Sequence, residues 1–326
     1  MEVLELTELL QLFNKALEIE ALEKEPKGLY SPIRYAMSMG GKRLRPILTM
    51  LCSQTFGANP EKAIPAAMAI EFFHNSTLVH DDIMDKSPLR RNQTTVYKKW
   101  NTNTAILSGD AMIILAYQYL ARLDSKSLAE VMPVFNKIAL QVCEGQQYDM
   151  DFENTMDVTV GDYIEMVRLK TSVLLAGSAQ IGAILGGATQ GQQKLIYSFG
   201  ENLGIAFQLQ DDYLDVFGTK DDFGKKIGGD IVAKKKTFLL IKALELARGE
   251  YLEQLIGLIN SKTISADEKV EKVTAIYRIL EIDKRTEEAI HKYFDLAYDS
   301  LNKLANEGIN TALLSEYANK LSNRKN

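Results

Sequence analysis

The chain has 326 residues, a net charge of −5 at pH 7 and two cysteines. It carries no basic tail and no lysine/arginine stripe interleaved with aromatic residues, so a nucleic-acid partner is not expected. Cys52 and Cys143 provide neither a metal-binding spacing nor a disulfide framework. The opening residues lack the basic start and apolar run of a signal peptide, so we expect a cytoplasmic location.

The composition predicts a helical protein. All seven prolines lie at or before Pro133, and the later stretch is rich in Leu, Ala, Ile, Lys and Glu, which favour helix. Apolar residues recur there at three- and four-residue spacing, as over 239–247. Since no linker and no fixed repeat is visible, we predict one all-α domain over residues 1–326, a bundle around a deep central cavity.

Breaks at glycine and proline set the expected helices in chain order. We expect an amphipathic helix over 3–25 and breaks near Pro26, Gly40-Gly41 and Pro60. A further helix should lead through 72–78 into residues 81–85, with a loop over 87–92 after it. Later helices are expected at 104–122, at 127–150, after a cap at Asp157, and from about Leu195 to 215. Three or four more should follow a Gly/Lys-rich loop at 224–230.

Residues 171–193 carry no formal charge, a length that could span a bilayer. Most of the segment is Gly, Ala, Ser, Thr and Gln, so membrane insertion would be marginal. We expect a buried helix whose small residues allow close packing, and no transmembrane segment.

Two aspartate clusters share one spacing: Asp81-Asp82-Ile83-Met84-Asp85 and Asp211-Asp212-Tyr213-Leu214-Asp215. The first and last aspartates of each lie four residues apart, on one face of a helix. Carboxylates stacked in this way repel each other unless a cation intervenes, and Mg²⁺ takes one or two carboxylates together with phosphate oxygens. The pair of clusters therefore suggests a metal clamp for a phosphorylated ligand.

Either cluster alone would be interpreted as a solvated acidic face. The apolar sequence around each favours the mouth of a cavity, since an unpartnered carboxylate is costly to bury. Neither cluster has the alternating ligands, central glycine and closing glutamate of an EF-hand loop.

Several cationic motifs accompany the clusters. Gly40-Gly41-Lys42-Arg43-Leu44-Arg45-Pro46 places three cations at a helix start, where unpaired N–H groups also suit a phosphate. Arg90-Arg91 offers rigid forks for bidentate phosphate binding. Each of these motifs, like Lys170-Thr171 and Lys235-Lys236-Thr237, could by itself be an exposed basic turn.

In this order the motifs resemble the trans-isoprenyl diphosphate synthases, or polyprenyl synthetases. The matching elements are GGKRLRP (40–46), HNSTLVHDDIMD (74–85), the arginine pair 90–91, SGD (108–110), KT (170–171), QLQDDYLD (208–215), GKKIGGDI (224–231) and KKKT (234–237). The resemblance covers roughly the whole chain. Asn92 departs from it, since the family often has glycine after the arginine pair.

The resemblance implies an all-helical bundle, usually a homodimer, that condenses isopentenyl diphosphate head-to-tail with an allylic diphosphate. It implies several Mg²⁺ ions, with Asp81, Asp85 and Asp211 as direct ligands. Asp82, Asp212 and Asp215 would act through water or as supports. The allylic diphosphate would be held by Arg90, Lys170 and Lys235, isopentenyl diphosphate by Lys42, Arg45, His74 and Arg91, and Lys225 would close over the site.

The chemistry agrees with these roles, because charge developing on a departing diphosphate needs cations placed in advance. The allylic cation left behind needs acceptor dipoles, for which Thr171 and Gln208 are candidates; Gln208 could equally make a structural hydrogen bond. The departing diphosphate itself is the expected base. His80 is expected to be a satisfied neighbour of the aspartates.

Two other activities remain open. A class I terpene cyclase would share the first aspartate motif, but it would lack GGKRLRP and a second aspartate cluster. A silent regulatory subunit would have degraded one cluster, whereas both are intact here.

The resemblance also implies that the helix before Asp81 lines the cavity into which the product grows. Ser76 and Thr77 are small, and Phe73 lies two turns before Asp81, about 12 Å along the helix at about 1.5 Å per residue. A floor at Phe73 predicts farnesyl or geranylgeranyl diphosphate. If Phe73 is ordinary core packing, the cavity is open and hexaprenyl to octaprenyl products are expected.

Overall fold

The computed structural model describes residues 3–20, 23–153, 155, 157–218 and 227–322. These residues are mostly helical and form almost no strands, which confirms the all-α class. They divide into two compact units, each assembled from three separate segments of the chain. The expectation that residues 1–326 form a single domain stays a prediction.

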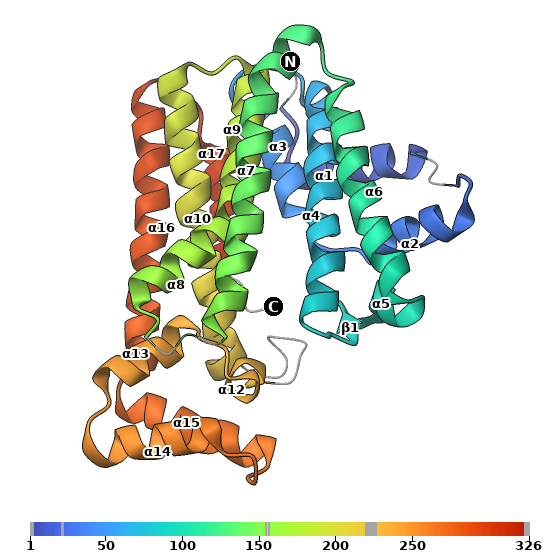
Figure 1. Ribbon diagram of the computed structural model, residues 1–326. Helices are drawn as coiled ribbons and strands as arrows, with labels where there is room; N and C mark the ends of the chain where they lie inside the picture. The colour runs from blue at the N-terminus through green and yellow to red at the C-terminus, as the bar shows by residue number, and fades with distance from the viewer. Residues whose placement is uncertain (1–2, 21–22, 154, 156, 219–226, 323–326) are drawn as a thin grey trace. The chain divides into compact units, whose positions relative to one another are not determined.

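The first unit comprises residues 1–139, 174–197 and 303–314. Its helices include α1 (Leu6–Ile19), α2 (Lys27–Ser38), α3 (Leu44–Thr55), η1 (Pro60–Ala63), α4 (Ile64–Met84), α5 (Val96–Lys99) and α6 (Thr102–Leu120). Helix α4 lies beside α6 and also packs on α3 (Figure 1). Its buried positions lie on all sides, so it is a central helix of this unit.

A two-stranded antiparallel hairpin follows α4, where a loop was expected. Strands β1 (Leu89–Arg90) and β2 (Gln93–Thr94) pair in it, and Arg91 and Asn92 form the turn with φ of 51° and 61°. Both turn residues are thus left-handed, as a two-residue hairpin turn with type I′ geometry requires. Asparagine tolerates this conformation, which accounts for Asn92 in place of glycine.

The second unit comprises residues 140–173, 198–302 and 315–326. It includes α8 (Val160–Val167), the π-helix η2 (Arg168–Ser172), α12 (Gly229–Ala233), α13 (Phe238–Leu246), α14 (Gly249–Asn260) and α15 (Ala266–Ile279). Helices α14 and α15 pack side by side (Figure 1). An apolar cluster that includes Val216, Leu239, Val273 and Tyr277 fills the interior of this region.

Unit boundaries fall inside five of the described helices: α7 (Ser125–Phe152), α9 (Val173–Gly186), α10 (Gln190–Phe217), α16 (Ile282–Asn306) and α17 (Ala312–Ser322). Helix α17 is the last helix among the described residues.

Three expectations about helices need correction. After residue 227 there are six described helices instead of three or four, because breaks at 247–248 and 261–265 keep them short. The N-cap of α8 is Thr159 instead of Asp157; its hydroxyl accepts from the Asp162 N–H in a capping box. Helix α10 begins at Gln190, five residues before the expected start.

The uncharged segment lies largely in α9, as expected. Among the described residues, only the continuous helical stretch Val160–Gly186 is long and apolar enough to cross a membrane. In its most apolar window, 72% of the residues are buried inside the protein, which is typical of a core helix. The finding favours the predicted buried helix.

Candidate functional site

The first aspartate cluster lies at the C-terminal end of α4. Asp82 is buried; Arg90 donates from Nε to its Oδ1 at 2.9 Å, and Arg90 Nη2 forms an ion pair with the same oxygen at 2.7 Å. Burial raises the pKa of Asp82, and Arg90 opposes this. Asp81 is half-buried and Asp85, the C-cap, is exposed. Because a helix C-terminus is the negative end of the macrodipole, this cluster favours a bound cation.

The loop before α3 holds Arg91 and Arg43 in different ways. Arg91 donates to the Gly40 carbonyl, and its guanidinium would lie 2.6 Å from a Cβ at Gly41. Gly41 has a φ of 125° and leaves room for this approach. Lys42 is exposed, whereas Arg43 is buried in an ion pair with Glu71 and donates to the Met37 carbonyl at 2.6 Å. Of the three cations expected at the helix start, Arg43 is therefore committed to the protein interior.

His74 lies beside Arg45, with 3.3 Å between His74 Nε2 and Arg45 Nη1. Since arginine can only donate, Nε2 accepts and the ring proton lies on Nδ1. The pKa of His74 is held well below its usual value by burial, and four arginines add to the effect. A neutral histidine within a cationic group can still donate one hydrogen bond from Nδ1.

His80 is a satisfied neighbour of the aspartates, as expected. Its Nε2 lies 3.2 Å from the Ile106 carbonyl and 3.7 Å from Asp110 Oδ1. A Cβ at Gly109 would collide with the His80 ring, so the Ser108-Gly109-Asp110 motif makes room for this side chain.

The residues considered for product length lie on α4. Phe73 is buried and packs edge-on against Phe135, with ring centroids 5.6 Å apart. Ser76 is fully buried and donates to the Phe73 carbonyl at 2.6 Å, while Thr77 is half-buried and donates to the His74 carbonyl at 2.8 Å. The packing of Phe73 is compatible with both a floor and ordinary core packing.

In the second unit, a π-helix carries Lys170 and Thr171. Lys170 Nζ lies 2.5 Å from Asp149 Oδ2. Thr171 donates to Gln208 Oε1 at 3.3 Å, and Gln208 donates to Asp212 Oδ1 at 2.9 Å. Such π-helical turns occur often at functional sites.

The second aspartate cluster lies near the C-terminal end of α10. Asp212 is buried and accepts from Tyr163 at 2.5 Å, while Asp215 accepts from the Asp230 N–H at 2.9 Å. Asp211 is only half-buried. Burial and then Asp230 raise the pKa of Asp212 to about 7 and that of Asp215 to about 6.

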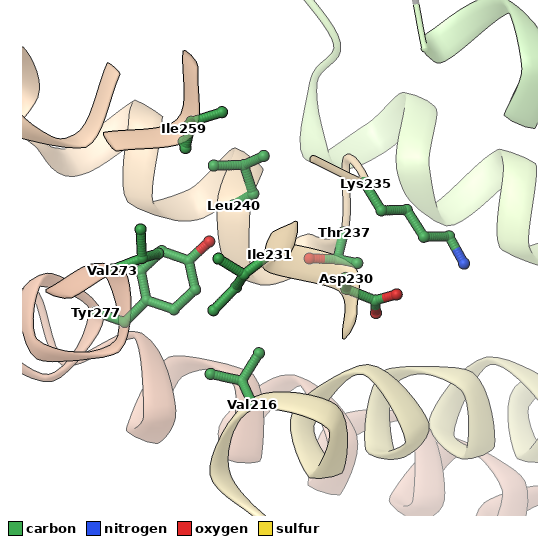
Figure 2. A pocket seen from close by; sticks show the side chains of 9 residues that line it. All are labelled: Val216, Asp230, Ile231, Lys235, Thr237, Leu240, Ile259, Val273 and Tyr277. Carbon is green, nitrogen blue, oxygen red and sulfur yellow. The ribbon is translucent and has the colours of Figure 1, made fainter. Parts of the chain in front are cut away.

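Lys235 is exposed, and its charge lowers the pKa of both Asp212 and Asp215, so it lies near the second cluster. A narrow pocket in this unit has Asp230, Lys235 and Thr237 along one side (Figure 2). Apolar side chains, among them Ile231, line the rest. Lys225 lies outside the residues that the structure describes.

Three residues near the predicted ones were missed in the sequence: Asp149, Tyr163 and Asp230. Asp230 stands inside the GKKIGGDI motif, so that motif was a usable signal. Asp149 and Tyr163 stand in no element used for the resemblance. Their importance comes from contacts with Lys170 and Asp212, which lie 21 and 49 residues away in sequence.

The residues fit a metal that the substrate helps to bind. Among the described residues, no three His, Cys, Asp or Glu side chains are grouped so that they could hold a metal ion by themselves. Asp81, Asp85 and Asp211 are the more accessible members of their clusters, whereas Asp82, Asp212 and Asp215 are buried and bonded to protein groups. One or two accessible carboxylates with phosphate oxygens are typical Mg²⁺ ligands.

Comparisons with a protein family, with individual sequences and with a solved structure all find prenyl diphosphate synthases. The sequence matches the family described as polyprenyl synthetase over residues 26–280. It is 42% identical to a geranylgeranyl pyrophosphate synthase of Geoglobus acetivorans over 72% of this chain and 74% of that protein. It is 36% identical to a geranylgeranyl diphosphate synthase of Sulfolobus acidocaldarius over 86% of this chain and 85% of that protein. A crystal structure of a geranylgeranyl pyrophosphate synthase aligns with a TM-score of 0.93 at 42% identity, covering 100% of both chains.

Proposed function

The chain belongs to the polyprenyl synthetase family and is a trans-prenyltransferase, and from this premise we propose that it makes an all-trans polyprenyl diphosphate. It condenses isopentenyl diphosphate head-to-tail with dimethylallyl, geranyl and farnesyl diphosphates. The product is farnesyl or geranylgeranyl diphosphate. The observation that carries the proposal is the pair of aspartate clusters, each with accessible carboxylates and a cationic side chain nearby, Arg90 at the first and Lys235 at the second. The names of the similar relatives support the four-unit product over hexaprenyl to octaprenyl chains.

The allylic diphosphate is assigned to Arg90, Lys170 and Lys235. Arg90 uses Nε and Nη2 for Asp82, so Nη1 is the nitrogen proposed for the substrate. Lys170 has three donors and gives one to Asp149. Isopentenyl diphosphate is assigned to Lys42, Arg45, Arg91 and His74. The ring proton of His74 lies on Nδ1, because Nε2 accepts from Arg45, and Nδ1 is the proposed donor.

The family is in general dependent on a divalent metal, and we propose Mg²⁺. Asp81, Asp85 and Asp211 would hold it with the substrate, and Asp82, Asp212 and Asp215 would support them or act through water. When bound, the metal supplies positive charge to the leaving diphosphate.

The protein also stabilises the allylic cation and removes no proton itself. The oxygens of Thr171 and Gln208 lie in one hydrogen-bonded pair and are the proposed acceptor dipoles. The double bond of isopentenyl diphosphate attacks the cation, and the departed diphosphate takes the proton that is lost. No protein general base is needed.

A homodimer in the cytoplasm is proposed. Leu107, Ile114 and Tyr117 are exposed along one face of α6, an apolar surface suited to a second copy.

The test is turnover of purified protein with dimethylallyl diphosphate and radiolabelled isopentenyl diphosphate, followed by chromatography of the dephosphorylated products. We expect C15 to C20 alcohols with Mg²⁺, none with EDTA, and recovery when Mg²⁺ is restored. C30 to C40 products would contradict the product assignment. A cyclic hydrocarbon would identify a cyclase, and activity only after addition of another subunit would identify a regulatory chain.

A further inference from the structure

A chain of hydrogen bonds, buried at Tyr163 and Asp212 and half-buried at Gln208 and Thr171, connects Tyr163 to Thr171 within the second unit. The Tyr163 hydroxyl, on α8, donates to Asp212 Oδ2 at 2.5 Å. One turn earlier on α10, Gln208 Nε2 donates to Asp212 Oδ1 at 2.9 Å, and Thr171 Oγ1 donates to Gln208 Oε1 at 3.3 Å. Both oxygens of Asp212 thus accept from protein groups. We call Tyr163, Asp212, Gln208 and Thr171 the relay.

The direction of each bond in the relay follows from the chemistry of its members. Asp212 is the acceptor in both of its bonds, so Gln208 turns its NH₂ group to Asp212 and its oxygen to Thr171. Because an amide oxygen also only accepts, the single proton of the Thr171 hydroxyl is committed to Gln208. Toward any other neighbour, Thr171 then presents oxygen lone pairs, the negative end of its dipole.

Tyr163 is built to hold this orientation. Its side chain is 1% exposed and packs against Phe238, with ring centroids 6.5 Å apart. Its hydroxyl has one proton to donate, and the acceptor is Asp212 Oδ2 at 2.5 Å, so the hydroxyl is held in one direction. In a hydrogen-bonded network of this kind each member fixes the orientation of the next.

We propose that Tyr163 is a positioning residue that, through Asp212 and Gln208, orients the Thr171 hydroxyl so that its oxygen faces the allylic cation. This inference rests on the proposed function. Tyr163 touches no substrate in it; the residue acts only by holding Asp212 and the Gln208 amide in one orientation. A dipole fixed before the charge develops stabilises a cation without the cost of reorientation.

The first experiment separates charge recognition from ordinary binding. Binding of two inert allylic analogues is measured by calorimetry: a thiolodiphosphate with a neutral chain, and an ammonium diphosphate with a positive charge in place of the cation. Wild type should prefer the ammonium analogue, and Tyr163→Phe should lose about tenfold of that preference while binding the thiolodiphosphate equally well. The matched control is Tyr213→Phe, which removes another tyrosine-to-carboxylate bond from α10, to Glu287 at 2.7 Å; its preference should stay unchanged.

The second experiment is a double-mutant cycle on kcat. Thr171→Val and Tyr163→Phe should each lower kcat about tenfold, and the double variant should be no slower than Thr171→Val alone, since the relay acts through Thr171. Fully additive losses, or an unchanged analogue preference in Tyr163→Phe, would overturn the inference. If Tyr163→Phe does not fold, Gln208→Leu breaks the relay at its next link and must show the same loss of preference. A wild-type protein without transferase activity would speak against the proposed function, whereas an active wild type with an unaffected Tyr163→Phe speaks against the relay alone.

Discussion

Adjacent residues of one motif can have opposite roles, as Lys42 and Arg43 do. Both belong to the GGKRLRP element and carry the same charge. Arg43 is buried and pairs with Glu71, which also accepts from Asn75 at 2.9 Å. Lys42 is exposed. Arg43 thus anchors the loop, and Lys42 is left on the accessible side of it.

Substitutions of Lys42 and Arg43 should therefore separate an effect on substrate binding from an effect on stability. Arg43→Ala leaves the Glu71 carboxylate buried without its partner and should lower the free energy of unfolding by about 3–5 kcal/mol. Lys42→Ala should leave stability within about 0.5 kcal/mol and raise KM for isopentenyl diphosphate. Urea denaturation and steady-state kinetics measure both. Equal stability of the two variants would refute the structural role of Arg43.

His74 predicts a dependence of stability on pH. Its pKa in the folded protein is held below the unfolded value of about 6.5, by burial first and then by Arg45, Arg91, Arg90 and Arg43. The unfolded chain therefore binds the proton first, and stability is lost as pH falls below about 6.5 toward the folded pKa. Denaturation curves at pH 7, 6 and 5 should show a smaller loss for His74→Gln than for wild type. The same loss in both proteins would exclude His74 as its source.

Phe73 predicts product length. Its ring packs on Phe135, so its position is well defined and it can close the space below Thr77. Phe73→Ala should lengthen the product, and Thr77→Phe should shorten it by filling the first turn below Asp81. Chromatography of the dephosphorylated products measures the change. An unchanged distribution in both variants would place the floor elsewhere.

At the level of elements, two glycines hold the π-helix that carries Lys170 and Thr171. A Cβ at Gly145 on α7 would collide with the Lys170 backbone nitrogen, and one at Gly204 on α10 would lie 2.6 Å from the Ser172 Cα. Since these contacts are with backbone, no side chain can move aside. Helices α7 and α10 therefore pack closely against the backbone of the π-helix, and each does so at a glycine.

Gly145→Ala and Gly204→Ala should displace Lys170 and Thr171 and lower kcat/KM for the allylic substrate by up to roughly 10²-fold, as misplacement near 1 Å can do. Gly257→Ala, in α14 with open space around it, is the control for a helix glycine without contacts. Gly182→Ala meets the Thr49 carbonyl in the first unit and controls for an equally tight clash elsewhere. Kinetics below the melting temperature of each variant should single out Gly145 and Gly204. Loss of activity that follows stability alone in all four variants would contradict the role.

At the level of the whole molecule, the exposed apolar face of α6 predicts the oligomeric state. Leu107 is 59% exposed and Ile114 is 60% exposed, one heptad apart on the same face. Leu107→Glu combined with Ile114→Glu should weaken a homodimer at least about tenfold, because charges would be buried without partners. Sedimentation velocity measures the dissociation. Leu296→Glu changes an exposed leucine on α16 and should leave the dimer intact.

Local patterns were the most predictable part of this protein. The all-α class follows from composition and three-and-four spacing, and the shared face of Asp81 and Asp85 follows from helix geometry within four residues. The ordered motifs identified the family, which the comparisons confirm. Short helices after residue 227 were undercounted because their breaks contain no proline.

The sequence by itself determined which residue types are available and at which helical spacing they stand. Only the tertiary structure decided which of them are buried and therefore committed to one another. Arg43 pairs with Glu71 across 28 residues, Lys170 with Asp149 across 21, and Asp212 with Tyr163 across 49. The physical reason is that the energy of a charge or a polar group depends on its burial and its partner, and both are set by packing between segments that are distant in the chain.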